Sequence, residues 1–172
     1  YTYTEGDNQT LIDQGTALTL TDSDGGDFNG GNLTVTITSG EDAAEDTLSL
    51  STLGTVSLAG TTAGNNVSVG GSVVGTLGNN IAAGNDLVVN FTTANATPVT
   101  IQTLARAITY ENTDTDNPTT GARNVRTTIN DGDGGTSSNQ DVTVTVEATP
   151  DITSAIYNAS TGALVVTGTK FE

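Results

Sequence analysis

Short runs in which apolar and polar residues alternate recur along the chain, and they limit its fold more than any other feature of the sequence. Each run is rich in Val, Ile and Thr, and Gly, Asn or Asp residues lie at its ends. A half-buried strand shows this period of two, because successive side chains point to opposite faces of a sheet. Short strands at this spacing are typical of an antiparallel sandwich or barrel. The runs predict strands at 17–21, 32–38, 46–51, 55–60, 66–77, 86–93, 124–130 and 140–148.

The alternation also argues against disorder. Only 34% of the residues are hydrophobic, and Gly, Asn, Asp, Ser and Thr are abundant, as they are in disordered chains. A disordered chain has no reason to keep its apolar residues in alternating runs. We therefore expect a thin core of Val, Ile, Leu and Ala, and one or two inserted hairpins in the Gly- and Asn-rich region at 53–85.

One segment departs from the strand pattern. In "ATPVTIQTLARAITY" (96–110), Thr97 is a suitable N-cap and Pro98 a suitable first helical residue. The segment also has apolar residues at helical spacing, which are Ile101, Leu104, Ala105 and Ile108. The pattern predicts one short helix near 97–107 that packs across the edge of the sandwich and leads into a strand at Ile108.

The chain changes character after residue 148. Pro150 ends the strand runs, and "DITSAIY" and "ALVVTG" form an expected hairpin around the turn "NASTG". We predict a first unit at 1–148 and a linker with a hairpin at 149–172. A lone hairpin is unstable in water. It therefore packs on the first unit, begins a second unit or complements another copy of the chain. We favour the interpretation that it begins a second unit. The start inside an expected strand and the lack of Met also favour a piece of a longer protein.

The net charge of −16 narrows the choice of partners. Only four residues are basic, and they are Arg106, Arg123, Arg126 and Lys170. Nucleic acids and anionic membrane surfaces bind clusters of basic residues, so we expect neither as a partner. No run approaches the ~18 apolar residues of a membrane span. Such a chain attracts cations, and its self-repulsion suggests that bound metal is part of the folded state.

Acidic and amide side chains gather in loops at a spacing that suits a hard cation. Ca²⁺ prefers six to eight oxygen ligands, and residues i and i+2 of an extended segment point the same way. Three loops carry such groups, and the linker and the first strand add two more acids. The candidate ligands are Glu5, Asp22, Asp24, Asp27, Asp114, Asp116, Asn117, Asp131, Asp133 and Asp151, with Glu111 and Asn112 nearby.

The predicted topology decides which of these ligands can meet. In a Greek-key sandwich, the Asp22 loop and the 111–122 loop can lie at the same pole, and Glu5 and Asp151 can join them. The Asp131 loop joins the last two strands of the first unit, so we expect it at the opposite pole. The alternative is that these Asp, Asn and Gly residues only form turns, which need no metal.

The composition leaves little room for catalysis. The chain has no His and no Cys, which excludes a Ser-His-Asp triad, thiol chemistry and disulfides. Paired carboxylates could serve a glycosidase, but its acid needs an apolar pocket, usually with aromatic side chains to stack the sugar. The chain has four Tyr, three Phe and no Trp. We therefore expect no enzymatic activity.

Two blocks of the sequence resemble a known family. "YTEGDNQTLID…LTLTDSDGGDFNGGNLTVTI" and "LARAITYENTDTDNPTTGARNVRTTINDGDGGTS…DVTVTVEA" resemble the cadherin-like repeats of giant secreted bacterial adhesins of the RTX type, and are similar to the chondroitin-sulfate-proteoglycan type of repeat. The tail "DITSAIYNASTGALVVTGTKF" resembles the opening of an Ig-like repeat. The resemblance implies tandem β-sandwiches, exported from the cell and stiffened by Ca²⁺. It implies as ligands Glu5, Asp22, Asp24, Asp114 and Asp116, and more weakly Asp131.

The linker departs from the family. "EATPD" offers only Glu147 and Asp151 in place of the Asp-x-Asn-Asp-Asn linker of animal cadherins. We expect an antiparallel Greek-key sandwich of the cadherin or Ig-like type that serves as an extracellular, Ca²⁺-stiffened module of a surface adhesin, matrix protein or fibre. Its expected partners are neighbouring repeats or copies of the chain, and cell-surface or matrix glycans are further candidates. The alternatives are a filament subunit that polymerises by strand donation and a glycan-binding module that uses 60–85.

Overall fold

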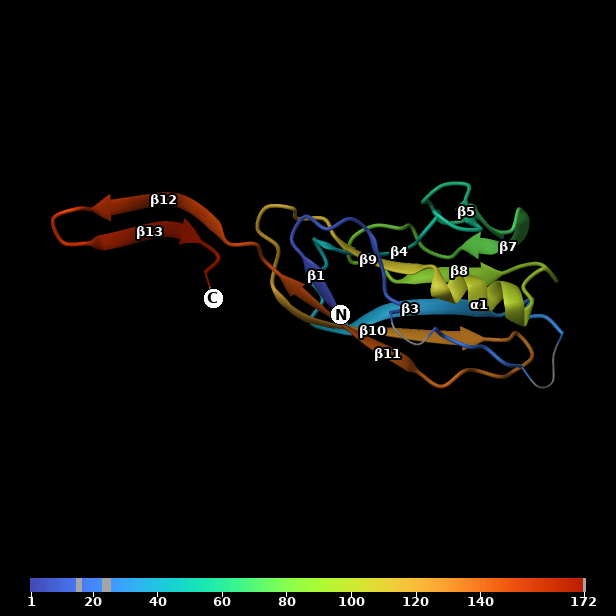
Figure 1. Ribbon diagram of the computed structural model, residues 1–172. Coiled ribbons are helices and arrows are strands. Elements are labelled where there is room, and N and C mark those ends of the chain that lie inside the picture. Colours follow the sequence, from blue (N-terminus) through green and yellow to red (C-terminus); the bar gives the residue numbers. More distant parts are fainter. Residues whose placement is uncertain (15–16, 23–25, 172) are drawn as a thin grey trace.

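The computed structural model describes residues 1–14, 17–22 and 26–171, and they form a mainly-β chain with one short helix and a C-terminal hairpin (Figure 1). The strands that precede the helix are β1 (Thr2–Thr4), β2 (Thr10–Leu11), β3 (Asn32–Ser39), β4 (Asp46–Leu50), β5 (Val56–Leu58), β6 (Asn66–Val69), β7 (Ser72–Leu77) and β8 (Leu87–Phe91). The helix α1 (Pro98–Arg106) follows, and then β9 (Ile108–Asn112), β10 (Gly121–Asn130), β11 (Gln140–Glu147), β12 (Asp151–Asn158) and β13 (Ala163–Thr169).

Two open sheets form the body of the molecule, by which we mean the chain from β1 to β11. The larger sheet has eight strands in the order β1-β11-β10-β3-β8-β7-β6-β5, and the smaller has three in the order β2-β9-β4. Strand pairs are antiparallel, except that β1 runs parallel to β11. Among the described residues, the hairpin of β12 and β13 forms a two-stranded sheet of its own, and it extends away from one end of the body (Figure 1).

Most of the strands predicted from the alternation are confirmed. The segments 32–38, 46–51, 55–60, 86–93, 124–130 and 140–148 overlap with β3, β4, β5, β8, β10 and β11, of which β3 and β10 extend beyond the predicted bounds. The Gly-rich stretch 66–77 forms the hairpin β6–β7, and its turn has positive φ at both Gly70 (59°) and Gly71 (82°). Two consecutive positive φ angles are what a tight hairpin turn requires, and Gly adopts them without strain.

The predicted strand at 17–21 is wrong, because this segment joins neither sheet. Hydrogen bonds to side chains take the place of the expected backbone pairing with a neighbouring strand. The backbone N–H of Leu18 donates to the carboxylate of Asp13, and the N–H of Leu20 donates to the side-chain oxygen of Gln102 at 3.0 Å. The carbonyl of Leu18 accepts a hydrogen bond from Nε of Arg106 at 2.8 Å. The segment 17–21 therefore lies against α1 and is held there by side-chain hydrogen bonds.

The predicted helix is confirmed with its cap. Thr97 is the N-cap and Pro98 the first residue of α1. The predicted inward face is also correct in large part, because Ile101, Leu104 and Ala105 are buried. No helix in the described part of the chain is long and apolar enough to cross a membrane.

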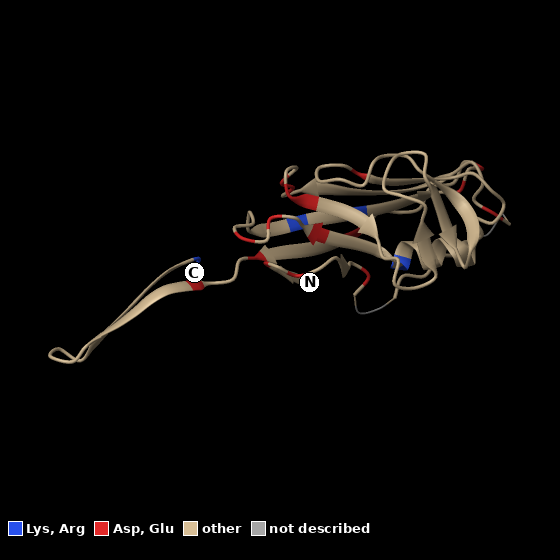
Figure 2. Cartoon of the chain, turned by 90° about the horizontal axis from the view of Figure 1, so that it is seen from above, with Lys and Arg blue, Asp and Glu red and all other residues tan. Residues whose placement is uncertain are grey.

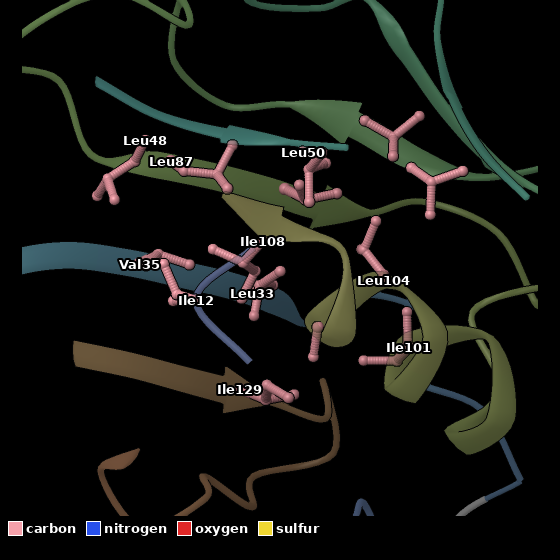
Figure 3. Packing of buried hydrophobic residues seen from close by; sticks show 14 of the residues in the cluster. Ile12, Leu33, Val35, Leu48, Leu50, Leu87, Ile101, Leu104, Ile108 and Ile129 are labelled. Carbon is pink, nitrogen blue, oxygen red and sulfur yellow. The ribbon is translucent and has the colours of Figure 1, made fainter. Parts of the chain in front are cut away.

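A single core joins the two sheets and the helix. Leu33 and Val35 of β3, Leu48 and Leu50 of β4, and Leu104 of α1 are each at most 2% exposed. Figure 3 shows these side chains pointing toward one another from different elements. The core is thin and mostly aliphatic, as expected from the composition.

The register of the strands places the loops at two ends of the body. The 113–120 loop and the 40–45 turn lie near the start of β10, as do Glu5 and the linker at 148–150, and we call this end the hairpin pole. At the other end of β10, Asn130 pairs with Asn32. The loop before β3 therefore lies beside the loop after β10, and we call this end the far pole. The ten residues of β10 span roughly 33 Å between the poles.

Candidate functional site

The hairpin pole is built around the buried carboxylate of Asp46, the first residue of β4, which is 1% exposed. Its Oδ2 accepts hydrogen bonds from Nε of Arg123 at 3.0 Å and from the backbone N–H of Asp42 at 2.7 Å. Its Oδ1 accepts from the hydroxyl of Tyr110 at 2.5 Å and from the side-chain amide of Asn112 at 3.2 Å. Asp46 is therefore both hydrogen-bonded and paired with a cation, as a buried charge requires.

Arg123 extends this network into the 113–120 loop. It is also 1% exposed, and its remaining N–H groups donate to the carbonyls of Gly121 at 3.1 Å and Thr119 at 2.5 Å. The approach of the 40–45 turn depends on Gly40, where φ is 77° and an added Cβ would lie 1.9 Å from the carbonyl oxygen of Ala122. The buried Asp46 and Arg123 side chains thus hold the 113–120 loop and the 40–45 turn together.

Two tyrosines close the network on the core side. The rings of Tyr3 and Tyr110 pack edge to face with centroids 5.2 Å apart. Burial raises the pKa of the Tyr110 hydroxyl, and its hydrogen bond to Asp46 raises that pKa further. The phenol therefore stays protonated and serves as a permanent donor to the Asp46 carboxylate.

A second layer of contacts lies nearer the surface. The hydroxyl of Thr119 donates to Asp42 at 2.8 Å, and the backbone N–H of Thr119 donates to Glu45 at 2.9 Å. The side-chain amide of Asn112 also donates to Glu45, at 3.1 Å. The backbone N–H of Ala44, followed by the Thr119 hydroxyl, lowers the pKa of Asp42. These acids are thus engaged in ordering the loop.

The sequence did not single out Asp46, Arg123 or Tyr110 as a site, although it contains a signal for them. Asp46 opens a predicted strand, where a carboxylate facing the core needs a cation nearby. Arg123 is one of only four basic residues in the chain, and it directly precedes the predicted strand at 124–130 that follows the acidic loop. The scarcity of basic residues would therefore have marked Arg123 as a candidate for a buried ion pair, but the identity of its partner, 77 positions away, comes only from the fold.

The linker and the hairpin meet the body at Glu5. Its Oε2 accepts from the backbone N–H of Thr149 at 2.7 Å, and its Oε1 accepts from Nζ of Lys170 at 2.6 Å. The same ammonium donates to the carbonyl of Asp116. The hydrogen bond with Lys170 lowers the pKa of Glu5 and raises the pKa of Lys170. We call Glu5, Thr149, Lys170 and Asp116 the junction.

Four of the predicted metal ligands line the cleft at the junction. The cleft has a volume of about 630 Å³, and its lining includes Glu5, Asp116, Asn117 and Asp151. Asp114 belongs to the same loop, but its Oδ1 accepts from the backbone N–H groups of Asp116 at 3.0 Å and Asn117 at 2.9 Å. These backbone donors lower the pKa of Asp114. One oxygen of Asp114 therefore caps a turn.

The far pole holds the other predicted ligands that the structure describes. Asp22 and Asp131 line one pocket of about 270 Å³. The Oδ1 of Asp131 accepts from the backbone N–H groups of Asp133 at 2.8 Å and Gly135 at 2.9 Å, and the Oδ1 of Asp27 accepts from the N–H of Asn29 at 3.0 Å. The bonds from Asp133 and Asn29 each span two residues, as in Asx turns. Asp24 lies outside the described residues.

The prediction that Asp22 shares a pole with Asp114 and Asp116 is wrong. Asp22 instead lines the same pocket as Asp131, which follows the end of β10. The expectation that the Asp131 loop lies opposite the 111–122 loop agrees with the structure, because β10 separates them. Among the described residues, no three Asp or Glu side chains are close enough to form a metal cluster. A cation at the junction would therefore use two carboxylates, Glu5 and Asp151, together with the Asp116 carbonyl and the Asn117 amide.

The junction already holds a positive group, the Lys170 ammonium, which lies between Glu5 and Asp116. Acidic residues also lie at both ends of the body, whereas the hairpin strands are almost free of charge (Figure 2).

Comparison of the chain with protein-family models, with curated proteins and with solved structures gave no match.

Proposed function

We propose that the chain is a non-enzymatic structural module of a long extracellular protein, such as a bacterial surface adhesin, a matrix protein or a fibre. One observation carries the proposal, which is that Glu5 of the body binds both the linker, at Thr149, and the hairpin, at Lys170. Units joined by a short linker move relative to each other by default. A double attachment restrains the direction in which the chain leaves the body, and a restrained direction serves a mechanical role.

The fold that we propose for the body is a Greek-key β-sandwich of the cadherin or Ig-like type. The supporting observation is that side chains from the eight-stranded sheet, the three-stranded sheet and α1 share one core, as two packed sheets do. In such a module the loops lie at the two ends, and they are in position to contact the next unit. The resemblance to cadherin-like repeats favours the same arrangement.

We further propose that Ca²⁺ strengthens the junction. The ligands would be Glu5, Asp151, Asn117 and the carbonyl of Asp116, all of which line one cleft. Ca²⁺ accepts such a mixture of carboxylate, amide and carbonyl oxygens, and water completes its shell. The ion would supply two positive charges where Lys170 supplies one. Lys170 and Ca²⁺ would therefore compete for Glu5.

The composition supports a role without catalysis, because the chain has no His and no Cys. Its partners would be neighbouring modules or further copies of the same chain, outside the cell. A glycan-binding role has less support, since the 53–85 region contains no aromatic residue to stack a sugar.

Thermal unfolding with Ca²⁺ and with a chelator tests the metal part of this proposal. At Ca²⁺ concentrations well above its Kd, we expect the midpoint to rise by about 5–10 °C, because only the folded state presents the ligands together. Glu5→Gln and Asp151→Asn should each remove most of this rise. Asp86→Asn is the matched control, since it removes the same charge from a residue outside the junction.

An unchanged midpoint in the parent protein would contradict a role for Ca²⁺. An equal loss of the rise in Asp86→Asn would show that net charge, and no specific site, causes the effect.

A further inference from the structure

The two faces of the hairpin differ in chemistry. Residues that pair directly across an antiparallel ladder lie on the same face, and alternate residues of a strand share a face. Tyr157 pairs with Leu164, and Ala155 with Val166, so these four residues lie on one face. Ile152 pairs with Gly168, two positions beyond Val166, and joins them.

Phe171 extends the same face. A Cβ added to Gly168 would lie 2.7 Å from the ring of Phe171, so this ring covers the glycine. We call this surface the apolar face of the hairpin, and its members are Ile152, Ala155, Tyr157, Leu164, Val166 and Phe171. The opposite face mixes Ile156 and Val165 with polar residues, which are Asp151, Ser154, Asn158, Thr167 and Thr169.

The apolar face is open to solvent. Its large side chains are 46–64% exposed. Elsewhere in the described chain the exposed large hydrophobic residues of the body are only Leu11, Leu53 and Val99. A contiguous apolar surface of this kind marks an interface, and a two-stranded hairpin needs such packing because it is unstable alone.

Charge and shape favour a second copy of the chain as the occupant. The segment 152–169 contains no charged residue, although the whole chain has a net charge of −16. Two copies that meet through this segment avoid the repulsion between acidic surfaces. The hairpin extends away from the body (Figure 1), so a two-fold pair of hairpins would keep the bodies apart.

The available area is also sufficient. The five large side chains expose on the order of 500 Å² in each copy. A symmetric pair would then bury roughly 1,000 Å², which is near the lower limit of specific interfaces.

We propose that the apolar face of the hairpin is a homodimer interface, closed by the same face of a second copy of this chain, in place of the further unit that the sequence favoured for the hairpin. The two hairpins pack face to face as two small sheets. This interface is distinct from the junction, and it needs neither Ca²⁺ nor Lys170.

Sedimentation velocity over a wide range of protein concentrations tests the proposal with two neighbouring substitutions. Leu164→Asn alters the apolar face, and Val165→Asn alters the opposite face at a similar exposure of 56% against 63%. We expect the parent chain to approach twice its mass of 17.3 kDa as concentration rises. Leu164→Asn should weaken dimerisation by roughly 100-fold, because a symmetric interface loses the leucine twice. Val165→Asn should leave it within a few-fold.

Two further measurements distinguish a loss of the interface from a loss of folding. Tyr157→Asn, on the same face as Leu164, should weaken the dimer as well. The thermal midpoint of the body should be unchanged in every variant, since the hairpin contributes no residue to the core.

A monomer at all concentrations would overturn the proposal, and so would a dimer that Val165→Asn weakens as much as Leu164→Asn does. Open-ended growth would overturn it too, because that outcome indicates pairing along the free strand edges. All of these results are independent of the response to Ca²⁺.

Discussion

Two arginines that lie three positions apart on β10 have different surroundings. Arg123 is buried with Asp46, whereas Arg126 forms an ion pair with Asp141 in which the side chains are 36% and 50% exposed. Removing one partner of a buried pair leaves an uncompensated charge, which costs about 3–5 kcal/mol. An exposed pair contributes far less to stability, because solvent screens the two charges. We expect Arg123→Met to lower the free energy of unfolding by the larger amount and Arg126→Met by the smaller, measured by denaturant unfolding. Similar losses in both variants would contradict the assignment of Asp46 as the centre of the hairpin pole.

The tyrosines of the same region give a pH dependence. Burial is the first cause that raises the pKa of Tyr1, Tyr3 and Tyr110. Unfolded tyrosines lose their protons near pH 10, before the folded ones do. The stability that comes from the neutral phenols is therefore complete below about pH 10 and is lost as the pH rises through the higher folded values. We expect the denaturant midpoint to fall above about pH 10, and to fall less in Tyr110→Phe. A flat midpoint across that range would show that these phenols are not buried.

At the scale of elements, α1 depends on its first turn. The hydroxyl of Thr97 accepts from the N–H of Thr100 at 3.4 Å, and the hydroxyl of Thr100 accepts from the N–H of Thr97 at 2.9 Å. Replacing an N-cap by Ala costs about 1 kcal/mol. We expect Thr97→Ala to lower the free energy of unfolding by this amount, whereas Thr97→Ser should be close to neutral. Denaturant unfolding measures both, and a larger loss for Ser than for Ala would exclude the capping role.

The sequence correctly predicted the elements whose residue pattern lies within the element itself. The residues that cap α1 and form its inward face all lie within eleven consecutive positions. Each confirmed strand likewise has the alternation of apolar and polar residues within its own segment. The segment 17–21 carries the same alternation but has no partner strand. Its backbone is held by Asp13, Gln102 and Arg106, two of which lie more than 80 residues away in sequence. No local pattern contains that information.

At the scale of the whole molecule, the site was harder to predict than the fold. The sequence identified the acidic loops, but their grouping depends on the fold, which places Asp22 and Asp131 at one pocket and Glu5, Asp116, Asn117 and Asp151 at another. Asp114 and Asp131 each use an oxygen to cap a turn, which was the simpler alternative for such loops. The Asp46–Arg123 pair joins residues 77 positions apart, so only the folded chain brings them together.

The proposed mechanical role requires that the hairpin keep a fixed direction relative to the body. The chain has no Cys, so Ser57→Cys on β5 and Ala159→Cys in the hairpin turn, both at exposed positions, can carry a pair of spin labels. We expect a narrow distribution of distances between the labels. Glu5→Gln and Lys170→Met should broaden it, because each removes the attachment at the junction, whereas Arg126→Met should not. If the unsubstituted junction already gives a distribution as broad as that of Glu5→Gln, the attachment does not set the direction of the hairpin, and the proposed function is wrong.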